Sequence, residues 1–418
     1  MTTQRADGDG LPQLGDYLVV CAMLYVSASA VLFDHYVLKM AVYVVVTCMY
    51  LLFRPLIGLR RELEAAAVLF LLVGLVVLVP LVNSDPDLTP YLTICVTLVL
   101  SFLLSRVLSL SAFAVVFVRV MLVLASASLV LFAVGLLFPA VVNALPHVEG
   151  QYLDYRDAGL HVYLVSNSPG GAGEILGRNS GFTWEPGAYS VLLNLALVLH
   201  LDQAVTTFSR RWRHLPTLVF VVAVITTLSP AGVLCTAATL IVYRRTLVRK
   251  DWKVGGGTVA LLMVVAYASY ELADILARAV SLRSLAYLGT NDRAVLERLS
   301  ISRLDSLDLT PWFPLGASFT TFEETGLPIW NSILHAAIAL GYPFTVILLL
   351  MNINLIAKFR PHALAMGLTL LLGYSVENYF WKPIFCFLLF AAFVQVHQRP
   401  SRGREARTTQ SRDESLHV

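Results

Sequence analysis

The sequence predicts an all-α integral membrane protein with about 12 transmembrane helices and two long extracytoplasmic loops. Of its 418 residues, 57% are hydrophobic and only 14% are charged. A soluble protein of this length could not cover its surface with so few charges. The apolar residues also gather into runs close to the ~20 residues that a membrane-crossing helix needs.

These runs form one transmembrane domain over residues 16–398, between a polar head at 1–15 and a polar tail at 399–418. Both ends lack the apolar residues of a folded core, so we expect them to be disordered and cytoplasmic. No convincing small-residue cleavage site follows the first run, so we expect a retained span rather than a signal peptide. The expected spans are 16–34, 38–54, 64–82, 90–110, 112–138, 186–207, 214–228, 230–246, 254–273, 328–354, 361–378 and 381–398.

Basic residues in the short connections predict the orientation, because they favour the cytoplasmic side. Twelve spans place every short basic connection, and the basic tail, on one side of the membrane. Merging the two spans around Leu228-Ser229-Pro230 into one broken helix would give eleven and move the basic connection 244–253 to the other side. The even count is therefore favoured, with both termini in the cytoplasm.

Two expected outer connections, at about 139–185 and 274–327, are long, and long connections tend to be functional. The first ends in GRNSGFTWEPG, directly before an apolar run. Pro186 suits the first turn of the following helix, and Glu185 then lies at the cap position, where a carboxylate is favoured. Glu185 is therefore either a helix cap paired with Arg178, or a group that orients or deprotonates a hydroxyl at the outer membrane surface.

The second outer connection is rich in arginine. Guanidinium groups bind phosphate in fork geometry and keep their proton, so the set predicts an anion-binding role. The alternative for any single arginine is a solvated loop with salt bridges to neighbouring acidic residues. The arginines are Arg278, Arg283, Arg293, Arg298 and Arg303.

Further polar residues are expected near the same outer face. Asn331 and His335 are four residues apart and share a helix face, and Glu377 lies between the last two spans. Ionisable residues at the rim of a span are functional candidates, although His335 taken alone is better explained as a buried structural histidine. The five cysteines lie in apolar runs without a CxxC pair, so we interpret them as packing residues and predict no metal site and no cofactor. The small net charge of +3 gives no reason to expect a nucleic-acid partner.

The segment from Arg178 to Gly187 resembles a motif of the O-antigen polymerase and ligase superfamily, R-x-x-G followed by E-P-G in the polymerases. Over about 175–395, shorter stretches resemble other motifs of that family in the same order. Trp330 stands where the ligases commonly have a histidine, and Ser302 stands where the family has a tryptophan. Glu185-Pro186-Gly187 and Trp330 favour a polymerase over a ligase. The shorter matching stretches are 229–232 (SPAG), 298–301 (RLSI), 314–316 (PLG), 341–342 (GY) and 377–383.

The resemblance implies a metal-independent glycosyltransferase of the multispan helical GT-C type. It would join oligosaccharide repeat units carried on undecaprenyl diphosphate, at the periplasmic face of the bacterial inner membrane. Its partners would be the lipid-linked donor and acceptor and a chain-length regulator protein.

On this hypothesis Arg298 and Arg178 bind the diphosphates, and Glu185 orients or activates the acceptor hydroxyl. Two other functions stay open: an O-antigen ligase, and a polysaccharide or lipid transporter. The transporter is disfavoured because the charges gather in two outer loops rather than near the midplane. The expected substrate-binding residues are Arg303, Arg293, Asn331, His335 and Glu377.

Overall fold

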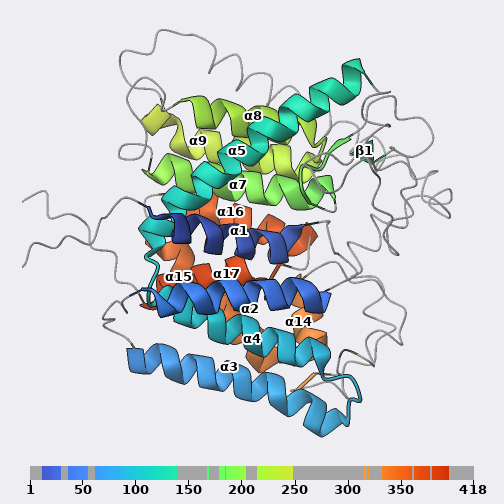
Figure 1. The fold of residues 1–418 in the computed structure, drawn as a ribbon, viewed down its shortest axis with the longest axis vertical. Helices are drawn as coiled ribbons and strands as arrows, with labels where there is room; N and C mark the ends of the chain where they lie inside the picture. The colour runs from blue at the N-terminus through green and yellow to red at the C-terminus, as the bar shows by residue number, and fades with distance from the viewer. Residues whose placement is uncertain are drawn as a thin grey trace, which may run out of the picture.

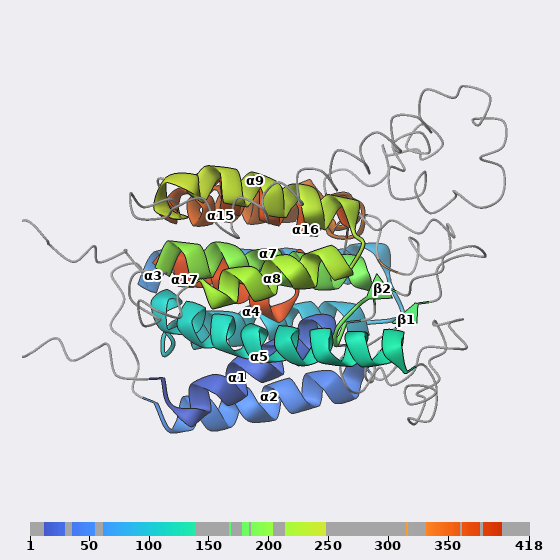
Figure 2. The same ribbon diagram turned by 90° about the horizontal axis from the view of Figure 1, so that it is seen from above.

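The computed structural model describes residues 12–29, 36–54, 62–138, 167–168, 178–183, 185–203, 214–247, 315–316, 319, 332–359, 362–376 and 379–394. These residues are mostly helical, as the sequence predicts, and the helices lie side by side in several layers (Figures 1 and 2). The only strands in the described ranges form a two-stranded antiparallel pair, β1 (Asn167–Ser168) with β2 (Arg178–Asn179). The helices are α1 (Leu14–Ala28), α2 (Tyr36–Leu52), α3 (Glu62–Asn83), α4 (Thr89–Ser105), α5 (Leu110–Leu137), α7 (Pro186–Gln203), α8 (Leu215–Thr226), α9 (Pro230–Leu247), α14 (Ser332–Leu340), α15 (Tyr342–Lys358), α16 (Ala363–Val376) and α17 (Pro383–Val394).

Most expected spans coincide with one helix each. The chain turns between α8 and α9 at Leu228, which has a φ of 50°, so the two short spans expected there are separate helices. The single span expected over 328–354 is wrong: it is divided into α14 and α15. The break is at Gly341, whose φ of 88° a side chain would rarely tolerate. The span expected at 254–273 lies outside the described residues.

Two helical stretches, α3 and the Leu110–Gly135 part of α5, are long and apolar enough to cross a membrane. Other apolar helices of the described ranges are shorter. Large apolar side chains are nevertheless exposed in stripes along several of them, including Val42, Val45 and Met49 of α2 and Val346, Leu350 and Ile353 of α15. Soluble monomers rarely expose so much contiguous apolar surface, so these stripes favour lipid surroundings.

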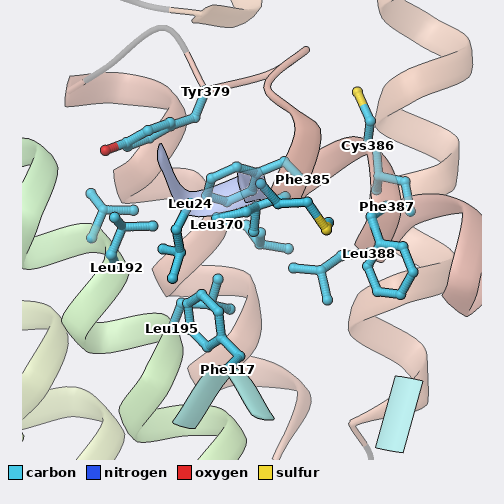
Figure 3. Packing of buried hydrophobic residues seen from close by; sticks show 14 of the residues in the cluster. Leu24, Phe117, Leu192, Leu195, Leu370, Tyr379, Phe385, Cys386, Phe387 and Leu388 are labelled. Atoms are coloured by element: carbon cyan, nitrogen blue, oxygen red, sulfur yellow. The ribbon is translucent and has the colours of Figure 1, made fainter. Parts of the chain in front are cut away.

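Helix α7 lies at the centre of the bundle. It packs against α5, α8, α9 and α16, and its residues from 186 to 201 are buried. A helix with apolar residues on most of its faces is expected in such a position. Figure 3 shows Leu192 and Leu195 of α7 near Phe117 of α5 and Phe385 of α17.

Small and polar residues allow α7 and α9 to approach closely. A Cβ added to Gly232 would lie 2.5 Å from the Cβ of Ser190. The Asn194 amide donates to the carbonyl oxygens of Ser190 (2.8 Å) and Gly232 (3.1 Å), and its Oδ1 accepts from Thr236 (2.8 Å). Small residues and side-chain amides are the usual contacts between helices in lipid.

We expect Gly232→Ala to lower the apparent Tm of the detergent-purified protein, because the methyl group must push α7 and α9 apart, at a cost of about 1–3 kcal/mol. Gly74→Ala is the matched control, since its Cβ would meet nothing within 4 Å. That control should be neutral or slightly stabilising, because alanine is the better helix former. Equal Tm values for the two variants would contradict the close packing of α7 on α9.

Candidate functional site

The segment 178–183 and the start of α7 form a fixed element at one end of the bundle, where Figure 1 also shows β1 and α14. β2 lies within this segment and pairs with β1. Thr183 forms an antiparallel bridge with Ser29, the residue that follows α1. The Thr183 hydroxyl donates to the carbonyl oxygens of Ser180 (2.8 Å) and Glu185 (2.7 Å). The element is therefore attached to α1 and closed on itself by its own hydrogen bonds.

Arg178 caps the end of α8. Its Nε donates to the carbonyl oxygen of Thr227 (3.1 Å), and an Nη donates to that of Leu228 (3.2 Å). A cation near the last carbonyls of a helix satisfies them and is favoured by the helix dipole. The sequence suggested that Arg178 pairs with Glu185. In the described residues, both hydrogen bonds of the Arg178 side chain go instead to the α8–α9 turn.

Asn179 joins α5 and α8 beneath this cap. Its buried amide donates to the hydroxyls of Ser128 (3.3 Å) and Thr226 (3.0 Å), and its Oδ1 accepts from the Gly181 N–H (2.9 Å). Gly181 has a φ of 54°, and a Cβ there would lie 2.5 Å from the ring of Tyr189. Glycine is thus required at 181 by both the backbone conformation and the space available.

Glu185 lies directly before the first residue of α7, Pro186, as the sequence predicts. Its carbonyl oxygen accepts from the Tyr189 N–H (3.2 Å), which closes the first turn of the helix. The residue is partly buried. Its carboxylate therefore belongs to the positive end of a helix that is itself held in the centre of the bundle.

Tyr379, between α16 and α17, connects the start of α7 to the start of α14. Its hydroxyl donates to the carbonyl oxygen of Ala188 (3.1 Å), and its N–H donates to the Ser332 hydroxyl (2.8 Å). Ala188 follows Glu185 by three residues, and Ser332 precedes His335 by three residues. This fully buried tyrosine therefore ties the helix start beside Glu185 to the helix that carries His335.

His335 is partly exposed and belongs to an aromatic group. Its ring centroid lies 5.1 Å from that of Trp381 and 5.7 Å from that of Phe319. Phe319 in turn contacts Tyr91 edge to face, and its N–H donates to the Tyr91 hydroxyl (3.0 Å). The His335 ring is therefore held in place by aromatic packing.

The end of α3 and the start of α4 contact Gly316 and Phe319, which precede α14 in the chain, and the sequence did not reveal this contact. The Asn83 amide donates to the carbonyl oxygen of Gly316 (3.2 Å), and the Tyr91 hydroxyl donates to the buried carboxylate of Asp85 (2.7 Å). A Cβ on Gly316 would lie 2.7 Å from both the Ala339 oxygen and the Gly341 nitrogen. The end of the second outer connection is thus fitted against the break between α14 and α15.

Lys39 is a further residue that sequence reasoning missed. It is 3% exposed, its Nζ donates to the carbonyl oxygen of Ser29 (2.6 Å), and it lies 6.0 Å from the ring centroid of Tyr25. It caps α1 as Arg178 caps α8. The position of Lys39 inside an apolar span could have identified it from the sequence. Ionisable residues are rare in such spans and usually have a function there.

Of the predicted site residues, the structure brings Arg178, Glu185 and His335 to the same end of the bundle through the contacts above. Within the described ranges, no group of three or more His, Cys, Asp or Glu side chains could hold a metal ion. The other predicted site residues lie outside the described residues: Arg293, Arg298, Arg303, Asn331 and Glu377.

Tyr379→Phe should lower the apparent Tm, by an amount equivalent to about 1 kcal/mol, because it removes the hydrogen bond to Ala188. Tyr243→Phe is the matched control: that tyrosine is also buried, and its hydroxyl makes no hydrogen bond within the described part of the chain. Thermal unfolding of both variants in the same detergent measures the difference. A Tyr379→Phe protein as stable as the control would show that the connection between α7 and α14 contributes nothing.

Comparison with known proteins does not assign the chain to a family. No family model matches the sequence, and no curated protein is significantly similar to it. The likeness to the O-antigen polymerase and ligase superfamily rests on the short motifs described above.

Proposed function

We propose that this protein is a glycosyltransferase that polymerises oligosaccharide repeat units carried on undecaprenyl diphosphate. The observation that carries the proposal is the folded form of residues 178–183 and 185–187. This family-like segment is a closed, largely buried element, and it fixes Arg178 and Glu185 at the end of the bundle where His335 lies. Such a fixed arrangement is what a reacting site needs, because side chains must be held in productive geometry.

In the proposed reaction, an acceptor hydroxyl attacks the anomeric carbon of the donor glycan. A carbon–oxygen bond forms there as the bond to the diphosphate breaks, and the electron pair leaves with undecaprenyl diphosphate. The Glu185 carboxylate orients the hydroxyl and accepts its proton. No cofactor is needed, because the sugar–diphosphate bond supplies the free energy.

Arg178 has a smaller share in this scheme than the sequence suggested. A guanidinium has five N–H donors, and two of those on Arg178 are occupied by the α8–α9 turn. The remaining donors can bind a phosphate oxygen while the bound ones keep the group fixed. Most of the charge that develops on the leaving diphosphate would then be stabilised by Arg298, with Arg303 and Arg293.

The proposal includes the membrane arrangement. Twelve spans with both termini in the cytoplasm would direct the end that carries Glu185 toward the periplasm of a bacterial inner membrane. Lipid-linked donor and acceptor would reach this end from the outer leaflet, and a chain-length regulator would bind beside it. The exposed apolar stripes on α2 and α15 support a membrane setting.

The direct test is an assay of the purified protein in detergent, first with a lipid-linked repeat unit as the only substrate and then with a different lipid acceptor added. We expect a ladder of products that differ by one repeat unit. Transfer of a single glycan block to an added lipid acceptor, without a ladder, would favour the ligase. The absence of any product, with the protein folded, would contradict both transferases and favour transport.

Glu185→Gln should lower the yield of the ladder by about 10²-fold or more, because the amide cannot accept the proton of the hydroxyl. Glu64→Gln is the matched control, since this exposed glutamate is in the first turn of α3, at the opposite end of the bundle. The apparent Tm of each variant, measured separately, distinguishes chemistry from folding. A Glu185→Gln protein that keeps the full ladder would limit Glu185 to capping α7.

A further inference from the structure

Arg119 lies on the exposed face of a long apolar helix. It is nine residues after Leu110, the start of α5, and is partly exposed. Residues at helical spacing on either side of it, Ser111 and Val123, are exposed. A stripe at this spacing faces the surroundings of the bundle, so the guanidinium reaches the same surroundings as the apolar side chains.

The partner of Arg119 is a neutral hydroxyl. An Nη of Arg119 donates to the Tyr17 hydroxyl (2.8 Å). Two other arginines at this end of the bundle are paired with carboxylates, Arg54 with Asp16 (2.5 Å) and Arg106 with Glu62 (2.9 Å). Among the described residues, no carboxylate lies within 4.0 Å of Arg119. A charged arginine side chain that faces lipid without a bound anion has an unfavourable free energy, so an anionic ligand would stabilise it.

The contact with Tyr17 indicates the depth of Arg119. Tyr17 is in the first turn of α1, close to the Arg54–Asp16 pair. The 28 residues of α5 extend over ~42 Å, about 12 Å more than the hydrocarbon of a bilayer. Arg119 is nine residues, or ~13.5 Å, from the start of α5, and a long arginine side chain can extend from there toward the boundary between hydrocarbon and headgroups. On the orientation proposed above, this boundary belongs to the cytoplasmic leaflet.

We propose that Arg119 and Tyr17 together bind the phosphate of an anionic glycerophospholipid such as phosphatidylglycerol. The Tyr17 oxygen accepts from Arg119, so its own O–H is available to donate to a phosphate oxygen. The remaining N–H groups of the guanidinium donate to the same phosphate in fork geometry. The acyl chains lie along the exposed side chains of Leu18, Cys21 and Val123.

This headgroup chemistry selects among lipids. Phosphatidylglycerol carries a phosphate without a compensating cation, whereas the ammonium of phosphatidylethanolamine competes with Arg119 for the phosphate. A guanidinium also binds phosphate better than a lysine ammonium does, because of its planar fork. The site therefore predicts a preference for anionic headgroups that depends on arginine at 119.

Native mass spectrometry tests the proposal on the full chain, in detergent with equal amounts of phosphatidylglycerol and phosphatidylethanolamine and no glycan substrate. We expect the wild type to retain phosphatidylglycerol preferentially and Arg119→Gln to lose that preference several-fold. Arg119→Lys should keep part of it, and Tyr17→Phe should weaken it less than Arg119→Gln does. Arg106→Gln is the control, because it removes the same charge from an arginine that Glu62 already pairs.

The proposal is overturned if Arg119→Gln, with an unchanged Tm, retains phosphatidylglycerol as the wild type does, or if the wild type retains both lipids equally. Should Arg119→Gln fail to fold, the proposal is overturned instead if Arg119→Lys and Tyr17→Phe both retain phosphatidylglycerol as strongly as the wild type does. A third arm adds polyprenyl monophosphate, and preferential retention of that lipid would contradict a glycerophospholipid as the occupant. Because no glycan is present, the outcome is independent of whether the protein polymerises.

Discussion

The hydrogen bonds from the Arg178 guanidinium to the carbonyl oxygens of Thr227 and Leu228 are the interaction on which the candidate site depends. A helix that ends in apolar surroundings leaves carbonyl groups that water cannot reach, and each unsatisfied group is costly. Arg178 donates hydrogen bonds to the carbonyl oxygens at the end of α8. Lys39 does the same at the end of α1, through the carbonyl oxygen of Ser29. A polar segment before α7 is therefore a structural requirement of this end of the bundle as well as a candidate reaction site.

The two requirements support each other. Asn179 and Thr183 hold the segment against α5, α8 and the end of α1, and Tyr379 ties the start of α7 to α14. The start of α7, which follows Glu185, and the first turn of α14, which carries His335, are consequently tied together. In the proposed glycosyltransferase, these contacts hold the Glu185 carboxylate in position for the acceptor hydroxyl. The N–H groups of Arg178 that bind the α8–α9 turn fix the guanidinium, so that its other N–H groups can bind a phosphate.

Local signals in the sequence predicted the helical class, the start of α7 at Pro186 and the separate helices on either side of Leu228. They failed where a distant contact decides the structure. The break at Gly341 interrupts an otherwise continuous apolar run, and Gly316, 25 residues earlier, packs directly against it. The sequence suggested the nearby Glu185 as the partner of Arg178, because Thr227, whose carbonyl oxygen Arg178 contacts, is 49 residues away. The anion-binding arginines of the second outer connection lie outside the described residues and stay a prediction.

The central claim is that the end of the bundle with Arg178 and Glu185 faces away from the cytoplasm. It is tested most directly by labelling single cysteines with a membrane-impermeant maleimide, after replacement of the five native cysteines. Asp87, exposed beside the α3–α4 turn that binds Gly316, and Leu63, 88% exposed at the start of α3, mark opposite ends of the bundle. The account predicts that Asp87→Cys is labelled in intact spheroplasts and that Leu63→Cys is labelled only after permeabilisation. The reverse pattern would place the site in the cytoplasm and contradict the proposed reaction.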